Sequence, residues 1–429
     1  MGHAPGMRPE GPGRMRIGFV SRSFPLDPDA SVIGIYKRMG MFIQAIRELG
    51  ELDMLFYVDE DLAISPAFVA DMEERLARHW GARIHLDLCN LARPTPVKGR
   101  WQEYVSPALG IAGCPPFQQT AQAAQVGAVD RLLARKPDIL FVHRLSCMIP
   151  VLLSKTAHPP IYFDMDDIEH VAFARSVSQP PRWRGKPLLY LRLPVLRLWE
   201  RRAVRSSHTT FVCSERDRDC LSAAYRCGNP ATVPNAVEIA PVHEIPDNRH
   251  LLFLGPLSYP PNRVAADHLI RNIWPRVLAA MPDATLSIAG AFPERAESFA
   301  DNPPNVKFLG FVDDLEKLYR EVSVVCCPIL AGGGTRIKIL EAAAHARPVV
   351  STTVGAEGIG LRDGEEIFLR DDAASFAEAC VRLLKEKRLA TDVGLAARLT
   401  VARHYERDAV VRDIRAHFDN AGGGQVHCA

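Results

Sequence analysis

Short apolar runs alternate with longer amphipathic segments along most of the 429 residues. The first run, 16–20, precedes an amphipathic stretch at 32–49, and the same order recurs up to about residue 213. Continuous apolar strands separated by helices are typical of parallel sheets that are buried on both faces. In this half we predict further strands at 53–58, 83–88, 138–142, 160–164 and 209–213, and helices at 66–79, 117–135 and 187–206.

The same rhythm restarts after 241–249, a polar stretch that contains two prolines. We therefore predict an α/β protein with two Rossmann-like, doubly wound domains, 15–240 and 241–399, that face each other across a cleft. Small-molecule sites commonly lie in such a cleft. In the second half the predicted strands are 250–254, 285–289, 306–309, 323–327 and 348–351, and the predicted helices are 262–281, 313–321, 335–346, 373–386 and 390–404.

The ends of the chain differ from this pattern. Residues 400–418 are polar and helical, and we predict that they cross back to the first domain. Residues 1–14 are predicted to be disordered, and 419–429, which include three consecutive glycines, to form a flexible tail.

Composition narrows the class of protein. Hydrophobic residues make up 47% and charged residues 24% of the chain, which is typical of a soluble globular protein. The 52 basic and 50 acidic residues give a net charge of +2, which argues against a nucleic-acid partner. The ten cysteines form no CxxC pair, the N-terminus lacks the apolar segment of a secretory signal, and no run approaches the ~20 apolar residues of a membrane span. We therefore expect a cytoplasmic protein with reduced cysteines.

The richest chemical signal is a glycine-rich turn followed by a basic helix start. Gly332, Gly333 and Gly334 free the backbone to approach a ligand, and Thr335 is the expected N-cap of the next helix. The unpaired N–H groups of a helix N-terminus attract a phosphate, and Arg336 and Lys338 add two cations in the first turn. Lys338 and Glu341 are three residues apart and share a helix face. The segment predicts a diphosphate at the glycines and a hydroxyl-rich group near Glu341; the alternative is a capped helix with a surface ion pair.

This segment resembles a known family. Residues 332–359 (GGGTRIKILEAAAHARPVVSTTVGAEGI) are similar to the donor-binding core of glycosyltransferase family 4, the group 1 glycosyltransferases. Further similar segments, in the family's order, are PDILFVHR, IYFDMDDIEH, TTFVCSERDRDCL with VPNAVEI, LLFLGPLSYPPNRVAADHLIRNIWPRV and NVKFLGFVDDLEKLYREVSVVCCPI. The resemblance spans about residues 15–418.

The resemblance implies the GT-B architecture, a nucleotide-sugar donor held by the second domain, a retaining outcome and no obligatory metal or other cofactor. It implies that Glu341 binds the ribose hydroxyls, whereas the family's first Glu, which usually contacts the donor sugar, is replaced here by Gly333. The family's Arg after Gly255 is also missing, so Arg336, Lys338 and Arg263 are expected to supply the charge. The implied donor-binding residues are Gly255, Pro256, Gly310, Phe311, Val312, Gly332, Gly333, Gly334, Thr335, Arg336, Lys338 and Glu341.

Catalysis is expected to depend on Arg336, Lys338, Glu341 and His143. The two cations would meet the negative charge that develops on the leaving diphosphate. His143 ends a predicted strand, where it would bond a donor hydroxyl or move a proton; a satisfied loop histidine is the alternative.

On the acceptor side we expect Gly34, Asp166 and Asp167. The acidic run would orient an acceptor hydroxyl. The alternatives are a metal site of the GT-A type and a solvated loop, and we expect no metal.

Residues 180–205 are basic and apolar, with Glu200 as the single acidic residue. Such a segment either lies on an anionic membrane surface or packs internally with its arginines in solvent, and the internal arrangement is preferred here.

The sequence thus predicts a retaining glycosyltransferase of the hexosyltransferase type, in polysaccharide or glycoconjugate biosynthesis. Its partners would be a nucleotide sugar and a glycan, lipid-linked or small-molecule acceptor. The alternatives are an epimerase of the same fold and a non-catalytic nucleotide-sugar binder. A dehydrogenase is disfavoured, because no G-x-G-x-x-G follows a strand near the first helix.

Overall fold

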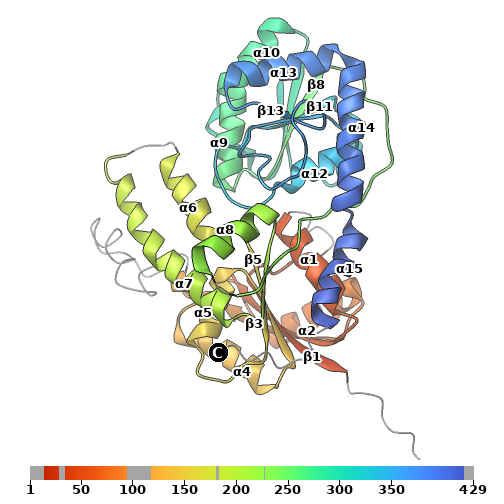
Figure 1. Ribbon diagram of the computed structural model, residues 1–429. Helices are drawn as coiled ribbons and strands as arrows, with labels where there is room; N and C mark the ends of the chain where they lie inside the picture. The colour runs from red at the N-terminus through yellow and green to blue at the C-terminus, as the bar shows by residue number, and fades with distance from the viewer. Residues whose placement is uncertain (1–13, 29–33, 94–116, 180–182, 227, 420–429) are drawn as a thin grey trace, which may run out of the picture.

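The computed structural model describes residues 14–28, 34–93, 117–179, 183–226 and 228–419. Two parallel sheets, each covered by helices, form two domains that stack end to end (Figure 1). This arrangement confirms the predicted fold class. The expectations for 1–13 and 420–429 lie outside the described residues.

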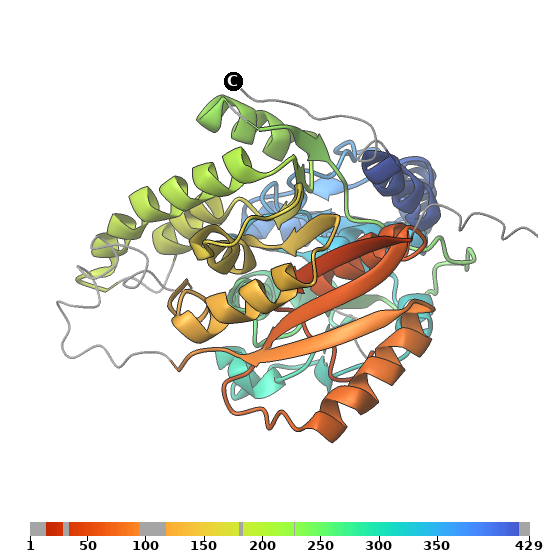
Figure 2. The same cartoon turned by 90° about the horizontal axis from the view of Figure 1, so that it is seen from below.

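The first domain is built on a seven-stranded sheet in the order β3-β2-β1-β4-β5-β6-β7. Figure 2, seen from below, places α8 near one edge of this sheet and α2 beside β3 at the other. The strands are β1 (Met15–Ser21), β2 (Gly50–Val58), β3 (Ile84–Asn90), β4 (Ile139–His143), β5 (Ile161–Asp166), β6 (Thr209–Val212) and β7 (Pro230–Thr232). The helices are α1 (Gly34–Ile46), α2 (Pro66–Trp80), α4 (Ala123–Ala134), α5 (Leu145–Leu153), α6 (Glu169–Ser178), α7 (Leu193–Ser206) and α8 (Glu215–Tyr225), with 3₁₀ turns η3 (Phe117–Gln119) and η4 (Lys186–Arg192).

The second domain has a six-stranded sheet in the order β10-β9-β8-β11-β12-β13. Its strands are β8 (His250–Leu254), β9 (Thr285–Ala289), β10 (Val306–Gly310), β11 (Val324–Cys327), β12 (Val349–Ser351) and β13 (Phe368–Leu369). Its helices are α9 (Pro260–His268), the π-helical turn η5 (Leu269–Ile273), α10 (Trp274–Ala280), α11 (Leu315–Arg320), α12 (Ile337–Ala344), α13 (Ala373–Lys385) and α14 (Lys387–His404), with short 3₁₀ turns η6 (Pro293–Arg295) and η7 (Glu297–Phe299).

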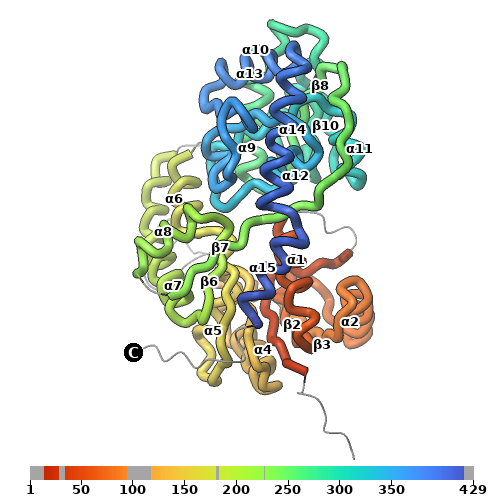
Figure 3. Tube along the Cα trace, turned by 45° about the vertical axis from the view of Figure 1, so that its right-hand side comes forward, coloured from red at the N-terminus to blue at the C-terminus, as the bar shows by residue number. Residues whose placement is uncertain are grey.

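The chain returns to the first domain at its C-terminal end. α14 runs along the second domain and stops at His404, and α15 (Arg407–Asp419) packs beside α1 (Figure 3). Phe418 is buried there, with its ring 4.4 Å from that of Tyr162. The predicted continuous segment over 399–418 is therefore two helices, with the break at Tyr405 and Glu406, where Glu406 forms a bridge with Val237.

Some predicted helices differ in extent. The predicted helix 187–206 is the 3₁₀ turn η4 followed by α7, with Pro194 in the first turn of α7, where a missing N–H costs nothing. The predicted helix 117–135 is η3 followed by α4. Helices α5 and α6 were not predicted. Every described residue of α5 before Leu152 is buried, so its sequence has no polar face to reveal a helical period.

Candidate active site

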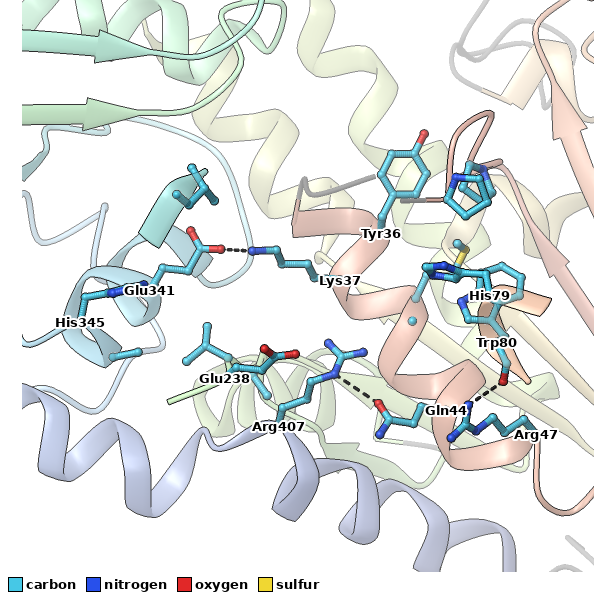
Figure 4. A pocket seen from close by; sticks show the side chains of 18 of the residues that line it. Tyr36, Lys37, Gln44, Arg47, His79, Trp80, Glu238, Glu341, His345 and Arg407 are labelled. Atoms are coloured by element: carbon cyan, nitrogen blue, oxygen red, sulfur yellow. Dashed lines mark hydrogen bonds and ion pairs between the residues drawn. The ribbon is translucent and has the colours of Figure 1, made fainter. Parts of the chain in front are cut away.

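A cavity of about 560 Å³ lies between the two domains (Figure 4). The first domain contributes residues of α1 and the end of α2, and the second contributes residues of α11 and α12. Glu341 enters this cavity from α12 and forms an ion pair with Lys37 of α1 across the gap. The Tyr319 hydroxyl donates to the same carboxylate at 3.4 Å. Glu341 therefore faces the interdomain cavity, as expected of a ligand-binding residue.

The glycine-rich loop lies between β11 and α12. Gly332 and Gly334 have φ angles of +115° and +64°, in the left-handed region that glycine adopts at low cost. A Cβ on Gly333 would lie 3.0 Å from Ala172 Cβ of the first domain. The loop thus needs its glycines both for its backbone conformation and for its close approach to the other domain.

The predicted N-cap at Thr335 is wrong. α12 begins at Ile337, and Arg336 is at the N-cap position without a side-chain capping bond. Thr335 Oγ1 instead accepts a hydrogen bond from Asn235 Nδ2 at 2.8 Å, so this hydroxyl joins the second domain to the segment between the domains. The N–H groups at the start of α12 consequently lack a side-chain cap.

Arg336 folds back over the glycine loop. Its guanidinium donates to the carbonyl oxygens of Gly333 and, at 3.4 Å, of Ala331. Its buried Nε has no hydrogen-bond partner among the described residues.

Lys338 is buried behind the loop. Its Nζ donates to Asn262 Oδ1 at 2.9 Å and lies 4.7 Å from the centre of the Phe253 ring. Burial, together with the nearby Arg336 guanidinium, lowers the pKa of Lys338 to about 8. In the described part of the chain neither Arg336 nor Lys338 forms an ion pair with a carboxylate, and Glu341 pairs with Lys37 instead. The alternative of a Lys338–Glu341 surface ion pair is therefore wrong, and among the described residues neither cation is directly paired with a carboxylate.

The first donor loop of the second domain contacts this lysine. Gly255 has a φ of +149°, and a Cβ there would lie 2.7 Å from Lys338 Nζ. The carbonyl of Pro256 accepts from Asn262 Nδ2 at 3.0 Å, which orients the Asn262 amide toward Lys338. Arg263 follows on α9. Lys338 of α12 thus places a positive charge beside the Gly255 loop.

The residues after β10 lie apart from the cavity lining. Gly310 has a φ of +67°, Phe311 is half exposed, and Val312 packs on the second-domain core. Leu315, a few residues on, lines the cavity.

His143 is fully buried at the end of β4. Its Nδ1 is 2.9 Å from Ser21 Oγ at the end of β1, and its Nε2 has no hydrogen-bond partner in the described residues. Burial lowers the pKa of His143 to about 3, so the ring is neutral. The side chain has no exposed surface, which disfavours the expected direct contact with a sugar hydroxyl.

The acidic run after β5 is held by arginines. Arg144 Nη2 lies 2.8 Å from Asp166 Oδ2 and 3.6 Å from Asp167 Oδ2. Burial and the neighbouring Asp166 raise the pKa of Asp167 to about 6. Burial alone would raise the pKa of Asp166, but Arg144 and Arg38 outweigh it and lower that pKa. The solvated-loop alternative is therefore wrong. Within the described ranges no group of three His, Cys, Asp or Glu side chains is placed to hold a metal ion.

Gly34 begins α1 and faces the start of α12. A Cβ on Gly34 would lie 3.2 Å from Ile337 Cγ2, so glycine permits this close contact between the domains. The preceding residues 29–33 lie outside the described part.

Several interdomain partners were missed from sequence. Lys37 pairs with Glu341, Asn235 with Thr335, and Glu357 of the second domain with Arg175 and Arg216 of the first. The partners are far apart along the chain, so no local pattern marked them.

Known proteins resemble this chain in sequence and in fold. The family model described as "Glycosyl transferases group 1" matches residues 248–386. A phosphatidyl-myo-inositol mannosyltransferase of Mycolicibacterium smegmatis is 28% identical over 208 residues, which cover 45% of this chain and 53% of that protein. An uncharacterized 44.6 kDa protein of the Klebsiella pneumoniae cps region is 27% identical over 175 residues, 39% of this chain and 45% of that protein. The chain thus spans about half the length of the curated relatives it matches.

Solved structures extend the likeness to both domains. Sucrose-phosphate synthase of Thermosynechococcus elongatus superposes with a TM-score of 0.67 at 16% identity, over 96% of this chain and all of that one. Anabaena HepE in complex with UDP and glucose gives a TM-score of 0.63 at 15% identity, over 94% and 99% of the two chains. At this identity the likeness establishes the fold alone. The second domain thus matches the model of the group 1 glycosyltransferases, and the two domains together form a GT-B fold.

Proposed function

We propose that this protein transfers a hexose from a nucleotide-sugar donor to a hydroxyl group of a glycan, lipid-linked or small-molecule acceptor. One observation carries the proposal: Arg336 and Lys338 stand beside the glycine loop at the start of α12 without a carboxylate partner among the described residues. A diphosphate would supply the missing negative charge and accept hydrogen bonds from the uncapped N–H groups of α12.

The nucleoside would extend along α12 from this point. Residues 336 and 341 are separated by about 8 Å along a helix that rises 1.5 Å per residue. This places Glu341 beyond the diphosphate, where its carboxylate can accept hydrogen bonds from two ribose hydroxyls. In the structure Lys37 forms an ion pair with Glu341, so the Glu341 carboxylate would interact with both Lys37 and the ribose. Relatives known as mannosyltransferases and a neighbour solved with UDP and glucose agree with such a donor.

We propose a retaining outcome. The acceptor oxygen would bond to the anomeric carbon on the face from which the diphosphate leaves, and a phosphate oxygen would take the acceptor proton. The bond from the anomeric carbon to the phosphate oxygen breaks, and its electron pair stays on the nucleoside diphosphate. Arg336 and Lys338 would stabilise that charge. His143, neutral and buried against Ser21, would support the ends of β1 and β4 rather than transfer a proton.

The acceptor is proposed to meet the enzyme near a membrane. Four apolar side chains are each between 38% and 49% exposed next to Arg184 and Arg192. They are Trp183, Leu188, Tyr190 and Leu191, here called the hairpin surface. The internal packing that the sequence favoured holds for α7, where Leu196 and Trp199 are buried, so the exposed side chains are confined to the part of the segment before it. Exposed aromatic and leucine side chains with basic neighbours suit an anionic lipid surface. None of the helices in the described residues has the length and apolar composition to cross a bilayer, so the contact would be peripheral.

Vesicle binding tests the hairpin surface. Cosedimentation with phosphatidylcholine vesicles that contain phosphatidylglycerol should exceed that with phosphatidylcholine alone. The double variant Leu188→Ser with Leu191→Ser should bind about tenfold more weakly, since two apolar side chains no longer enter the lipid. Leu399→Ser, at an exposed leucine of α14, is the matched control. Equal binding by both variants would refute the lipid contact.

The donor is tested first by thermal denaturation with UDP, GDP and their sugars. A ligand at 100 times its Kd stabilises the native state by about 2.7 kcal/mol, which raises the melting temperature by several degrees. Product analysis then separates the alternatives. A transferase needs an acceptor for full turnover, an epimerase converts the nucleotide sugar without one, and a non-catalytic binder shows binding but no product with any donor.

A further inference from the structure

The carboxylate of Asp167 fills the space that a side chain at 333 or 334 would need. A Cβ on Gly334 would overlap Asp167 Oδ1, and a Cβ on Gly333 would lie 3.3 Å from Asp167 Cγ. Asp167 belongs to the first domain, whereas both glycines belong to the second. Because Gly333 and Gly334 have no side chains, the Asp167 carboxylate of the other domain can lie against the loop.

The position of this carboxylate is well defined. Asp167 follows β5 directly, and its N–H donates to Met165 O at 2.7 Å. Arg144 lies 3.6 Å from its Oδ2, and the Asp167 side chain is 20% exposed. Arg336, on the other side, is close enough to favour the ionised form electrostatically. Asp167 thus stands between the two domains, near Arg336 at the start of α12, and its side chain is partly exposed.

The proposed donor geometry brings the sugar to this carboxylate. If the nucleoside extends from the start of α12 toward Glu341, the sugar leaves the diphosphate from the opposite end. That end faces the glycine loop and the end of β5. Ionised carboxylates are strong hydrogen-bond acceptors and can bind two neighbouring sugar hydroxyls at once. Asp167 is the carboxylate that contacts the glycine loop at this point.

Resting on the proposed function, we infer that Asp167 of the first domain binds hydroxyl groups of the donor sugar, in the place that Gly333 and Gly334 leave open. Arg144 orients the carboxylate from behind. Asp167 therefore acts on the donor, not on the acceptor as the sequence suggested. Because the contact crosses the domain gap, the sugar is bound fully only when the domains are together.

The test measures how tightly the variant Asp167→Asn binds a nucleoside diphosphate and the corresponding nucleotide sugar. The substitution keeps the shape of the side chain and removes its charge. Calorimetry is run with UDP, GDP, UDP-glucose and GDP-mannose, and the pair that the wild type binds is used. We expect the Kd of the nucleotide sugar to rise about 10- to 100-fold, the loss of a hydrogen bond to a charged group, while the Kd of the nucleoside diphosphate changes less than about threefold. Asp167→Glu should recover part of the affinity for the nucleotide sugar.

The control is Glu357→Gln, which weakens the contacts of Glu357 with Arg175 and Arg216 between the same domains. A merely structural Asp167 would behave like this control and lower the affinities for diphosphate and sugar nucleotide to the same degree. That outcome, or unchanged binding of the nucleotide sugar, overturns the inference. If the wild type binds none of the four nucleotides, the proposed function fails and the inference fails with it.

Discussion

Lys338 has a buried ammonium group close to the glycine-containing loops of the candidate site. The residue comes from α12, and its ammonium group lies beside the Gly255 loop. Asn262 and the Phe253 ring hold its ammonium group, and neither neutralises it. A buried cation without a carboxylate partner in the described structure is costly, so an anionic ligand would relieve the site.

Lys338→Met removes this charge and keeps most of the apolar length of the side chain. The loss of a hydrogen bond to a charged group costs about 1.5–3 kcal/mol, so the donor nucleotide should bind about 10- to 100-fold more weakly. Isothermal titration calorimetry measures the change. Lys317→Met, at an exposed lysine of α11, is the control. An unchanged Kd for Lys338→Met would exclude Lys338 from the donor site.

The lowered pKa of Lys338 predicts how donor affinity depends on pH. In the free protein the ammonium loses its proton near pH 8, and Cys327 beside it stays a thiol because burial raises the pKa of that group. A bound diphosphate favours the charged lysine and raises its pKa. Affinity should therefore be constant below about pH 7 and fall above pH 8, by up to about tenfold per pH unit. Titrations from pH 6.5 to 9.5 should show this step in the wild type and not in Lys338→Met.

At the scale of elements, α12 lacks a side-chain cap at its N-terminus, whereas α15 packs on the core of the first domain. The missing cap leaves N–H groups at the start of α12 available to the proposed diphosphate. α15 has a purely structural face: Val410, Val411, Ile414 and Phe418 are buried against the first-domain core. This packing attaches the C-terminal end of the chain to the domain that it does not follow in sequence.

Phe418→Ala tests the contribution of α15. The ring packs against Tyr162, Phe141 and Phe211, and its removal leaves a cavity. The free energy of unfolding should fall by about 3–5 kcal/mol in urea denaturation. Leu399→Ala, at a leucine that is 69% exposed on α14, should change it by less than about 0.5 kcal/mol. Similar losses for the two variants would mean that α15 is not anchored by this face.

At the scale of the whole molecule, ion pairs connect the two domains across the gap. Lys37 pairs with Glu341 on one side of the cleft, and Glu357 pairs with Arg175 and Arg216 on the other. These groups are partly exposed, so each pair contributes little and the domains can separate to admit a ligand. The charge pattern thus suits reversible closure.

The double variant Arg175→Ala with Arg216→Ala should shift the molecule toward open arrangements. Two such pairs contribute together about 1–2 kcal/mol, which changes the ratio of closed to open molecules about 5- to 30-fold. Small-angle X-ray scattering should report a larger radius of gyration than for the wild type. Arg388→Ala, at a fully solvated arginine of α14, should leave it unchanged. No difference between these two variants would show that the Glu357 contacts do not control closure.

The sequence by itself determined most of the strands, though not the short edge strands β7 and β13, and the chemistry of one loop. β8 and β9 were predicted to the residue, because each is a short and mostly apolar run that ends in a turn. The glycine loop, Arg336, Lys338 and Glu341 were recognisable because their spacing along the chain is itself the chemical pattern. Only the tertiary structure decided the partners of these groups. Three residues that lie 100 or more positions away contact α12 and its loop: Lys37, Asn235 and Asp167. Thr335, the expected N-cap, accepts a hydrogen bond from Asn235 instead. Such contacts depend on how two sheets are brought face to face, and no local periodicity carries that information.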